Sequence, residues 1–352
     1  MYLVPDTKYN LIPNTALGDE TVTLTEAKEL VAQSGRMLLE ERLAARTWGN
    51  ISCRVDEDRI VITPSGLGYE AMRPEDVVSM SMSSGEWEGR LKPSSEKGVH
   101  IAAYRTLPDA RFVIHTHQTY ASAIGLTGMD DLALTEEERT ALGGIEAAGY
   151  ALPGTKRLAN NIEKAFRKGA HVVLLVRHGV VIAASDREEA FRRARLLETV
   201  CRRACKGQPA DEITHDEQMA KNLMASMSKA FKNVCHTGAA PVLACASAGK
   251  PIPAQLDDMA QMIGSRIMVA EAKEKAIQDA LGKEAVVLVP GIGAICRGLT
   301  ELDAKALCLL AEKACICWLH TQALEVNTKL SWFDTMLMHW IYLMKYSKAA
   351  GA

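Results

Sequence analysis

The sequence of 352 residues lacks several features that mark particular classes of protein. It has no excess of basic charge, because 41 lysines and arginines are balanced by 43 aspartates and glutamates. The net charge of −2 therefore predicts neither a nucleic-acid partner nor a polybasic membrane patch. No run of about 18 uncharged apolar residues occurs, so we expect no membrane-spanning helix. The start, MYLVPDTKYN, lacks the basic and apolar regions of a signal peptide.

A disulfide framework is also missing from the sequence. The nine cysteines are an odd number, spread singly or along helix-like segments, which is typical of reduced thiols. Together with the missing signal peptide, this predicts a cytoplasmic protein. With 48% apolar and 24% charged residues, the composition excludes a disordered or collagen-like chain. The length suggests two domains or one large one.

Helix-like and strand-like patterns alternate through the first part of the chain. The apolar spacing predicts helices at 25–43, 93–107, 155–168 and 186–206, and strands at 51–55, 59–63, 77–82, 111–117 and 171–185. Thr25 is the expected N-cap of the first helix. The last of these strand segments is a buried pair that turns at His178 and Gly179.

The second part of the chain repeats a portion of the first. VVLLVRHG at residues 172–179 is echoed by VVLVPGIG at 286–293, and matching residues continue at the same offset into the following helix. The helix before the first copy has a counterpart in 265–281. Because one register is kept across strand, turn and helix, we predict a shortened second copy, with chance similarity as the alternative. The predicted domains are 1–207 and 208–352.

Three histidines and a glutamate, Glu96, form the strongest candidate site. His115 and His117 stand in HTH at the end of an apolar strand, where alternation places both imidazoles on one face. His178, from a distant turn, completes the three-histidine set used by catalytic zinc, which leaves one position for water or substrate. A chance pair is the alternative for HTH taken alone, because nine histidines make such a spacing easy to obtain.

Short loops with hydroxyls and small residues are candidate anion sites. They are Gly49-Asn50, Thr63 with Ser65-Gly66, and Ser94-Ser95. Each offers backbone N–H groups without a bulky side chain, and the last precedes a helix whose N-terminus favours a phosphate. Taken singly, each loop is more often an ordinary turn than an anion site.

Taken in order, six separated motifs resemble the class II aldolase/adducin family, and in particular its fuculose-phosphate aldolases. The motifs are TWGNIS, TPSG with Tyr69 after it, KPSSE, HTH, PGT and RHGVV. The resemblance covers residues 25–207. It implies an α/β three-layer sandwich with a central, mainly antiparallel sheet flanked by helices, here followed by the smaller degenerate copy.

The resemblance also implies a set of site residues. His115, His117 and His178 would bind a divalent metal, zinc first, with manganese, cobalt or iron(II) as alternatives, and Glu96 would transfer a proton beside it. The substrate phosphate would be held by Gly49, Asn50, Ser65, Gly66, Ser94 and Ser95. The implied function is a metal-dependent lyase that cleaves a small phosphorylated ketose or keto acid to dihydroxyacetone phosphate and an aldehyde. The only implied partners are this substrate and further copies of the chain in a homo-oligomer.

Several alternatives stay open within this resemblance. Glu96 after Ser-Ser favours an aldolase or decarboxylase, because the family's 4-epimerases carry Asp there. A decarboxylase, a 4-epimerase, an unphosphorylated carboxylate substrate and an adducin-like binding module remain alternatives, although adducin heads have lost the histidines. The family's aldolases use a tyrosine between HTH and PGT, but residues 121–149 contain none, and neither Tyr120 nor Tyr150 is assigned.

The second copy lacks the residues of the predicted metal site. Ile292 stands where the first copy has His178, and neither His-X-His nor Ser-Ser-Glu occurs after residue 208. We therefore predict a structural role, either replacing a neighbouring subunit of a ring-like oligomer or covering the mouth of the site. The helix expected at 331–346 is apolar on nearly every side and must be covered by the fold or by another subunit.

Overall fold

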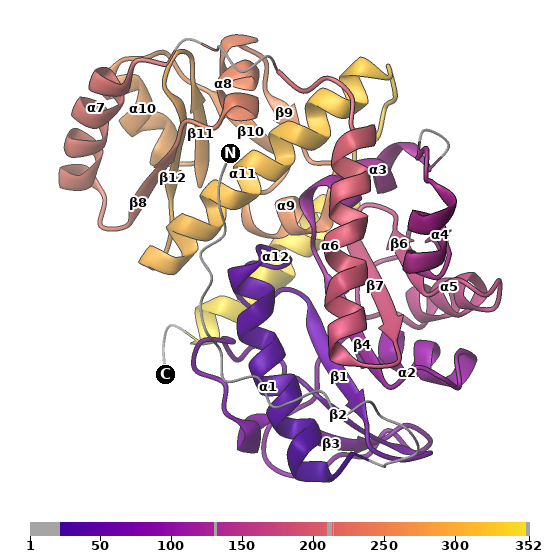
Figure 1. Ribbon diagram of the computed structural model, residues 1–352. Coiled ribbons are helices and arrows are strands. Elements are labelled where there is room, and N and C mark those ends of the chain that lie inside the picture. Colours follow the sequence, from indigo (N-terminus) through magenta and orange to yellow (C-terminus); the bar gives the residue numbers. More distant parts are fainter. Residues whose placement is uncertain (1–21, 130–131, 210–212, 214, 350–352) are drawn as a thin grey trace.

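The computed structural model describes residues 22–129, 132–209, 213 and 215–349, and it contains two sheets that lie in separate lobes (Figure 1). The strands of the first sheet are β1 (Asn50–Arg54), β2 (Arg59–Ile62), β3 (Val78–Ser81), β4 (Phe112–Thr116), β5 (Ile145–Ala148), β6 (Val172–Leu175) and β7 (Gly179–Ala184). Their order in the sheet is β3-β2-β1-β4-β7-β6-β5. Only β5 and β6 pair in parallel among these strands, so the sheet is mainly antiparallel, as predicted.

Helices cover both faces of the first sheet. They are α1 (Leu24–Glu40), the short 3-10 helix η1 (Pro74–Asp76), α2 (Lys97–Thr106), α3 (Thr119–Thr127), α4 (Glu136–Leu142), α5 (Lys156–Phe166) and α6 (Arg187–Ala204). Strand residues such as Ile114 share a core with α1, α3 and α6, whereas Val113 shares a core with α2 and α5. Because neighbouring residues of a strand point to opposite faces, β4 contributes to both cores, and the unit is the predicted three-layer sandwich.

The second unit contains a smaller sheet. Its strands are β8 (Val234–Thr237), β9 (Ile252–Pro253), β10 (Arg266–Val269), β11 (Val286–Val289) and β12 (Gly293–Arg297), in the order β8-β12-β11-β10-β9. Its helices are α7 (Glu217–Ala230), α8 (Ala240–Ser247), α9 (Asp257–Met262), α10 (Glu274–Leu281), α11 (Glu301–Ala323) and α12 (Trp332–Ala349). The run β8-β12-β11-β10 has the same pairing directions as β4-β7-β6-β5.

Two local predictions were wrong. The N-cap of α1 is Thr23, not Thr25, because the Thr23 hydroxyl accepts from the backbone N–H of Glu26 and the Glu26 carboxylate accepts from that of Thr23 in return. The helical counterpart expected over 265–281 is limited to α10. The preceding Arg266–Val269 forms strand β10, since it pairs in parallel with β11.

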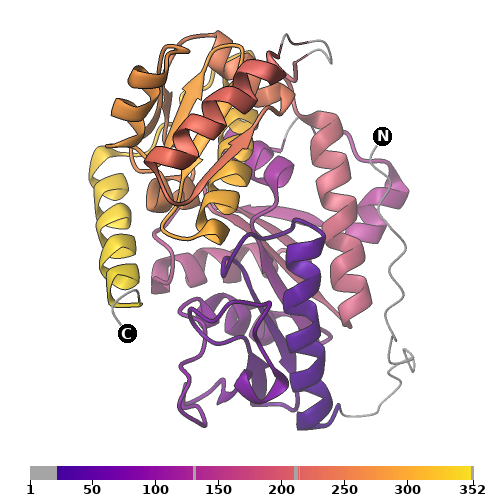
Figure 2. The same ribbon diagram turned by 90° about the vertical axis from the view of Figure 1, so that its left-hand side faces the viewer.

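The two units are packed together through α11 and α12. Helix α11 lies against α3, and the core of the second unit includes Ala123 and Leu126 of that helix. Helix α12 packs on α9, and Figure 2 shows it in yellow, running from the second unit along the edge of the first. In the part of the chain that the structure describes, no helix has both the length and the apolar character needed to cross a membrane.

Candidate metal centre and its cavity

Three imidazoles meet where β4 and the β6–β7 turn lie side by side. His115 is on β4, His117 follows that strand, and His178 stands in the turn before β7. The Nε2 atom of His115 lies 3.1 Å from Nε2 of His178 and 3.2 Å from Nε2 of His117. All three residues are buried, with exposed fractions of 0, 9 and 3% for His115, His117 and His178. The predicted histidine cluster is therefore brought together by the fold.

The donor set of this cluster fits a divalent metal ion. Each imidazole makes a contact through Nδ1, to the Val180 carbonyl from His115 and to a carboxylate from each of the other two. The three Nε2 atoms are thereby directed at one another. Tetrahedral zinc with Zn–N bonds of about 2.0–2.1 Å places its nitrogen ligands roughly 3.3 Å apart, close to the two separations above. Neutral imidazole nitrogens of this kind are zinc's preferred protein ligands together with thiolates.

Glu96 lies against the same nitrogen atoms. It immediately precedes α2, and its Oε1 lies 2.9 Å from Nε2 of His178. Its Oε2 lies 3.5 Å from Nε2 of His115 and accepts a hydrogen bond of 3.0 Å from the Asn50 side chain. Burial raises the pKa of Glu96, but the facing imidazoles of His115 and His178 outweigh it and hold the pKa well below its usual range. Glu96 is therefore a carboxylate at the edge of the cluster.

Charge and burial act in opposite directions on the imidazoles. Burial lowers the pKa of His115 and of His117. Burial also acts to lower the pKa of His178, but the carboxylates of Glu96 and Asp257 outweigh it and raise that pKa to about 10. The cluster thus gathers negative charge around His178, where a bound cation would be stabilised.

A cavity of about 490 Å³ opens onto the cluster. Every residue predicted to hold phosphate lines it, namely Gly49, Asn50, Ser65, Gly66, Ser94 and Ser95. Glu96, His117 and His178 line the same cavity, whereas His115 lies behind them. The C-terminal helix α12 contributes an apolar wall through Leu337 and Ile341. The candidate anion loops and the histidines, far apart in the sequence, therefore face one space.

Comparison with known proteins identifies the N-terminal unit. A family model described as the class II aldolase and adducin N-terminal domain matches residues 29–205, about half of the chain. The chain belongs to the class II aldolase and adducin family. Class II aldolases use a divalent metal, and this chain has a three-histidine group able to hold one.

Relatives within the family have different names. A 5-deoxy-D-ribulose 1-phosphate aldolase of Bacillus thuringiensis serovar kurstaki is 36% identical over 176 residues, which cover 49% of this chain and 81% of that protein. An L-ribulose-5-phosphate 4-epimerase of Salmonella paratyphi B is 30% identical, covering 57% of this chain and 95% of that protein. A 3-oxo-tetronate 4-phosphate decarboxylase of Haemophilus influenzae is 30% identical, covering 49% of this chain and 83% of that protein. The solved structure of an L-fuculose 1-phosphate aldolase is 30% identical in sequence, with a TM-score of 0.47. The match covers 60% of this chain and 100% of that one.

Three charged residues at the site were not predicted from the sequence. Asp257 and Asp258 begin α9, and Lys313 lies in α11, all beyond the end of the family match at residue 205. Asp257 contacts His178, and Asp258 contacts both His117 and Lys313. No ligand-like spacing marks these residues in the sequence, because their partners are brought to them only by the packing of the two units.

His100 and Tyr342 also reach the surroundings of the site. His100, one turn along α2 from Glu96, donates from Nε2 to the Asn50 side chain and accepts at Nδ1 from Ser52. This chain of hydrogen bonds holds the Asn50 amide toward Glu96. Tyr342 of α12 lines the cavity, and its hydroxyl accepts a hydrogen bond of 2.7 Å from Arg46.

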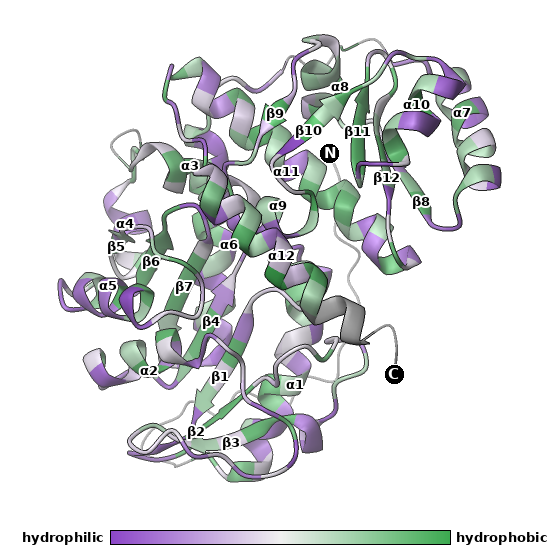
Figure 3. Cartoon of the chain, turned by 180° about the vertical axis from the view of Figure 1, so that it is seen from behind, coloured by the Kyte–Doolittle hydropathy of each residue, from purple (hydrophilic) through white to green (hydrophobic). Residues whose placement is uncertain are grey.

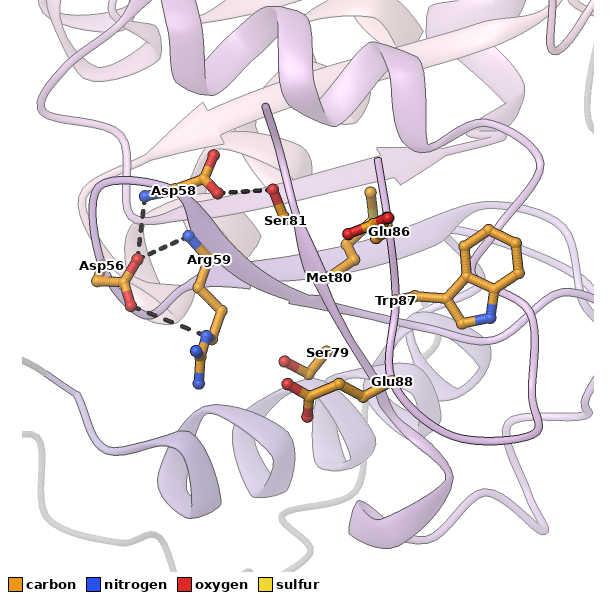
Figure 4. A pocket seen from close by; sticks show the side chains of 9 residues that line it. All are labelled: Asp56, Asp58, Arg59, Ser79, Met80, Ser81, Glu86, Trp87 and Glu88. Atoms are coloured by element: carbon orange, nitrogen blue, oxygen red, sulfur yellow. Dashed lines mark hydrogen bonds and ion pairs between the residues drawn. The ribbon is translucent and has the colours of Figure 1, made fainter. Parts of the chain in front are cut away.

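A second cavity, of about 340 Å³, lies beside the β2–β3 hairpin and shares no lining residue with the first (Figure 4). It is lined by acidic groups, and two of the four carboxylates drawn there, those of Asp56 and Asp58, hold local turns. Asp56 accepts from the backbone N–H of Arg59 at 2.7 Å, and Asp58 accepts from the Ser81 hydroxyl at 2.6 Å. Asp56 and Asp58 therefore have a structural role in the turn between β1 and β2 and in its contact with β3.

Proposed function

We propose that the protein is a metal-dependent lyase that cleaves a small phosphorylated ketose or keto acid to dihydroxyacetone phosphate and an aldehyde. The observation that carries the proposal is the placement of Glu96 beside three converging Nε2 atoms, in one cavity with the predicted phosphate loops. His115, His117 and His178 would hold the metal, for which zinc is the first candidate. The membership in the class II aldolase and adducin family supports the same reaction class.

The residues of the chain have distinct parts in this reaction. A bound divalent metal would act as a Lewis acid toward the substrate's carbonyl and adjacent hydroxyl oxygens. The loops at Ser65-Gly66 and Ser94-Ser95 present hydroxyls and backbone N–H groups that would bind the phosphate and fix the substrate's orientation. In the cleavage, the hydroxyl on the carbon that becomes the aldehyde loses its proton, and the bond from that carbon to its neighbour on the carbonyl side breaks. The electron pair of this bond stays on the carbonyl side, and the neighbouring carbon then takes up a proton. Glu96, ionised and held by Asn50, would accept the hydroxyl proton or deliver the proton that this carbon takes up.

Epimerase and decarboxylase activity are the second candidates. Two relatives at 30% identity are named as a 4-epimerase and a decarboxylase, and both act on phosphorylated sugars or sugar acids by their names. Glu96 after Ser-Ser favours the aldolase over the epimerase, since the resemblance associates Asp with the 4-epimerases.

One assay separates these reactions. The zinc-loaded protein is incubated with 5-deoxy-D-ribulose 1-phosphate, L-fuculose 1-phosphate, L-ribulose 5-phosphate and 3-oxo-tetronate 4-phosphate, the substrates in the relatives' names. Release of dihydroxyacetone phosphate from a ketose 1-phosphate, followed by coupled NADH oxidation, is the expected result. Release of carbon dioxide alone would contradict the aldolase and identify a decarboxylase. Formation of an epimer alone would identify a 4-epimerase.

A non-catalytic binding module belongs to a different class and is distinguished by the same preparation. Such a module would neither retain metal nor turn over any of these compounds. If metal is retained but inorganic phosphate does not compete with a substrate, the loops hold a carboxylate instead of a phosphate.

The domain division and the assembly are part of the proposal. We assign residues 1–207 to the catalytic domain and 208–352 to a degenerate repeat, with one sheet in each.

We also propose a homo-oligomer. The apolar helix α12 packs on α9 but leaves Trp332, Phe333 and Trp340 exposed by 70, 68 and 59%, and Figure 3 shows the green of apolar residues along it. Light scattering should give a mass above one chain, which Trp340→Glu lowers; a monomeric wild type would contradict the assembly.

A further inference from the structure

We propose that Asp257 and Asp258 are positioning residues of the metal centre, through which the C-terminal unit orients His178 and His117. The inference rests on the metal centre of the proposed function. It gives the second unit a role that follows neither from its proposed likeness to the first unit nor from the family match, which ends at residue 205. Both aspartates are almost completely buried, with exposed fractions of 0 and 1%.

Asp257 holds the turn that carries His178 by two contacts. Its Oδ2 lies 3.1 Å from Nδ1 of His178. Its backbone N–H donates to the carbonyl of Arg177, the preceding residue, at 2.9 Å. Its other oxygen, Oδ1, accepts a hydrogen bond of 3.2 Å from the Tyr150 hydroxyl. With Nδ1–H donated to this carboxylate, the lone pair of His178 is on Nε2 and faces the cluster.

Asp258 and Lys313 contact the ring and the main chain of His117, respectively. Oδ2 of Asp258 lies 3.4 Å from Nδ1 of His117 and 2.7 Å from Nζ of Lys313. The same Nζ donates to the backbone carbonyl of His117 at 3.1 Å. Oδ1 of Asp258 accepts from the backbone N–H of Met259 at 2.8 Å. Both the ring and the main chain of His117 are thus fixed by residues from α9 and α11.

The ring of His115, by contrast, is oriented by a residue of the first unit itself. Nδ1 of His115 contacts the carbonyl of Val180, on the adjacent strand β7 of the first sheet, at 2.8 Å. Two of the three ring orientations therefore depend on the second unit and one on the first. Histidine ligands of metals usually donate their other ring nitrogen to a carboxylate or a backbone carbonyl, and these partners set both the tautomer and the ring orientation.

The charge balance of the site supports the same assignment. Burying a carboxylate is costly unless it is paired, and Asp258 is paired with Lys313. Among the residues that the structure describes, no lysine or arginine forms an ion pair with Asp257 or Glu96. These two carboxylates instead flank the two ring nitrogens of one imidazole, His178. One imidazolium carries a single charge for two carboxylates, whereas a divalent ion at the Nε2 atoms would balance both.

The test is the zinc affinity of the full-length protein, measured by competition with a chromophoric chelator and without substrate. Asp257→Asn and Asp258→Asn keep the size of the side chain and remove its charge. Because partners of this kind commonly contribute a factor of about 10–100 to metal affinity, we expect zinc to bind that much more weakly in each variant. The cobalt-loaded variants should also show altered visible absorption bands, which report ligand geometry and which a merely structural role would not move.

Matched variants separate this effect from general damage. Glu312→Gln removes a carboxylate of the same unit that accepts from Thr237 and contacts neither histidine; its zinc affinity should equal that of the wild type. Tyr150→Phe removes only the hydroxyl that orients Asp257 and should weaken zinc binding several-fold, which keeps the test available if Asp257→Asn does not fold. Wild-type zinc affinity and unchanged cobalt bands in all aspartate variants would overturn the positioning role while the proposed function stands. A wild type that binds no zinc would overturn both.

Discussion

His236 occupies in the second sheet the position that His115 occupies in the first. His115 pairs across antiparallel strands with Val181, and His236 pairs in the same way with Ile295. A threonine follows each histidine, but the next residue is Gly238 where the first copy has His117. With Ile292 at the position of His178 in the turn, the second unit has a histidine at one of these three positions. In this register, the proposed repeat would also include β8.

This relationship gives a matched pair of substitutions. His115→Gln removes one of the three converging nitrogens, and we expect the purified protein to lose nearly all bound metal. His236→Gln removes a contact to the Ile292 carbonyl and the stacking on His215, both away from the three converging nitrogens. Metal content should therefore stay at the wild-type level, and stability should fall by about 0.5–1.5 kcal/mol from the lost hydrogen bond. Elemental analysis of both proteins decides this, and metal loss in the His236 variant would contradict it.

Glu96→Gln tests proton transfer separately from metal binding. Glutamine keeps the shape of the side chain and one acceptor oxygen but cannot accept a proton at neutral pH, so turnover should fall by a factor of about 10²–10⁴. Metal content should be unchanged if the three histidines suffice as ligands. Simultaneous loss of metal would instead make Glu96 a structural ligand of the centre.

Gly49 ties the backbone of one predicted anion loop to the metal centre. It has φ of +75°, and a Cβ there would lie 2.4 Å from the carbonyl oxygen of His115. Gly49→Ala should therefore destabilise the fold by at least about 3 kcal/mol. Gly85→Ala is the control, because its φ is +73° and no atom lies within 4 Å of the added carbon, so only the backbone penalty of about 1–2 kcal/mol applies. The free energy of unfolding of both variants is measured in urea. An equal decrease in the two would contradict a steric clash of the added Cβ with the His115 carbonyl.

His100 should make stability depend on pH. Burial lowers the pKa of its imidazole to about 3, whereas the unfolded chain has the ordinary value near 6.5. The unfolded state therefore binds more protons in this window, and stability is lost as the pH falls from 6.5 toward 3. For metal-free protein, the free energy of unfolding should fall between pH 7 and pH 5 by about 2 kcal/mol more in the wild type than in His100→Gln. Parallel pH profiles for the two proteins would contradict this assignment.

The parts of the fold that were predicted correctly have local signals. The alternation in RFVIHTH places His115 and His117 on one face, and the paired apolar runs around His178 predict β6 and β7. The six motifs indicated the family over nearly the range that the family model matches. Because strand register and turn chemistry are local, these elements and the histidine cluster could be predicted from the sequence.

The residues that were missed have no such local signal. The contact of Asp257 with His178 joins positions 79 residues apart, and that of Asp258 with His117 joins positions 141 apart. Helix α9, which carries both aspartates, has only six residues and too short a pattern to be recognised. Their role depends on how the second unit packs against the first, which neither periodicity nor motif spacing encodes.

The most direct test of the account is the metal stoichiometry per chain, measured on protein purified without added metal and without affinity-tag histidines. The account predicts one zinc or similar divalent ion per chain, lost on substitution of His178. Two ions per chain would contradict the proposal that residues 208–352 are a degenerate copy without metal ligands. No bound metal, even after zinc is supplied, would contradict the proposed enzyme and favour a binding module.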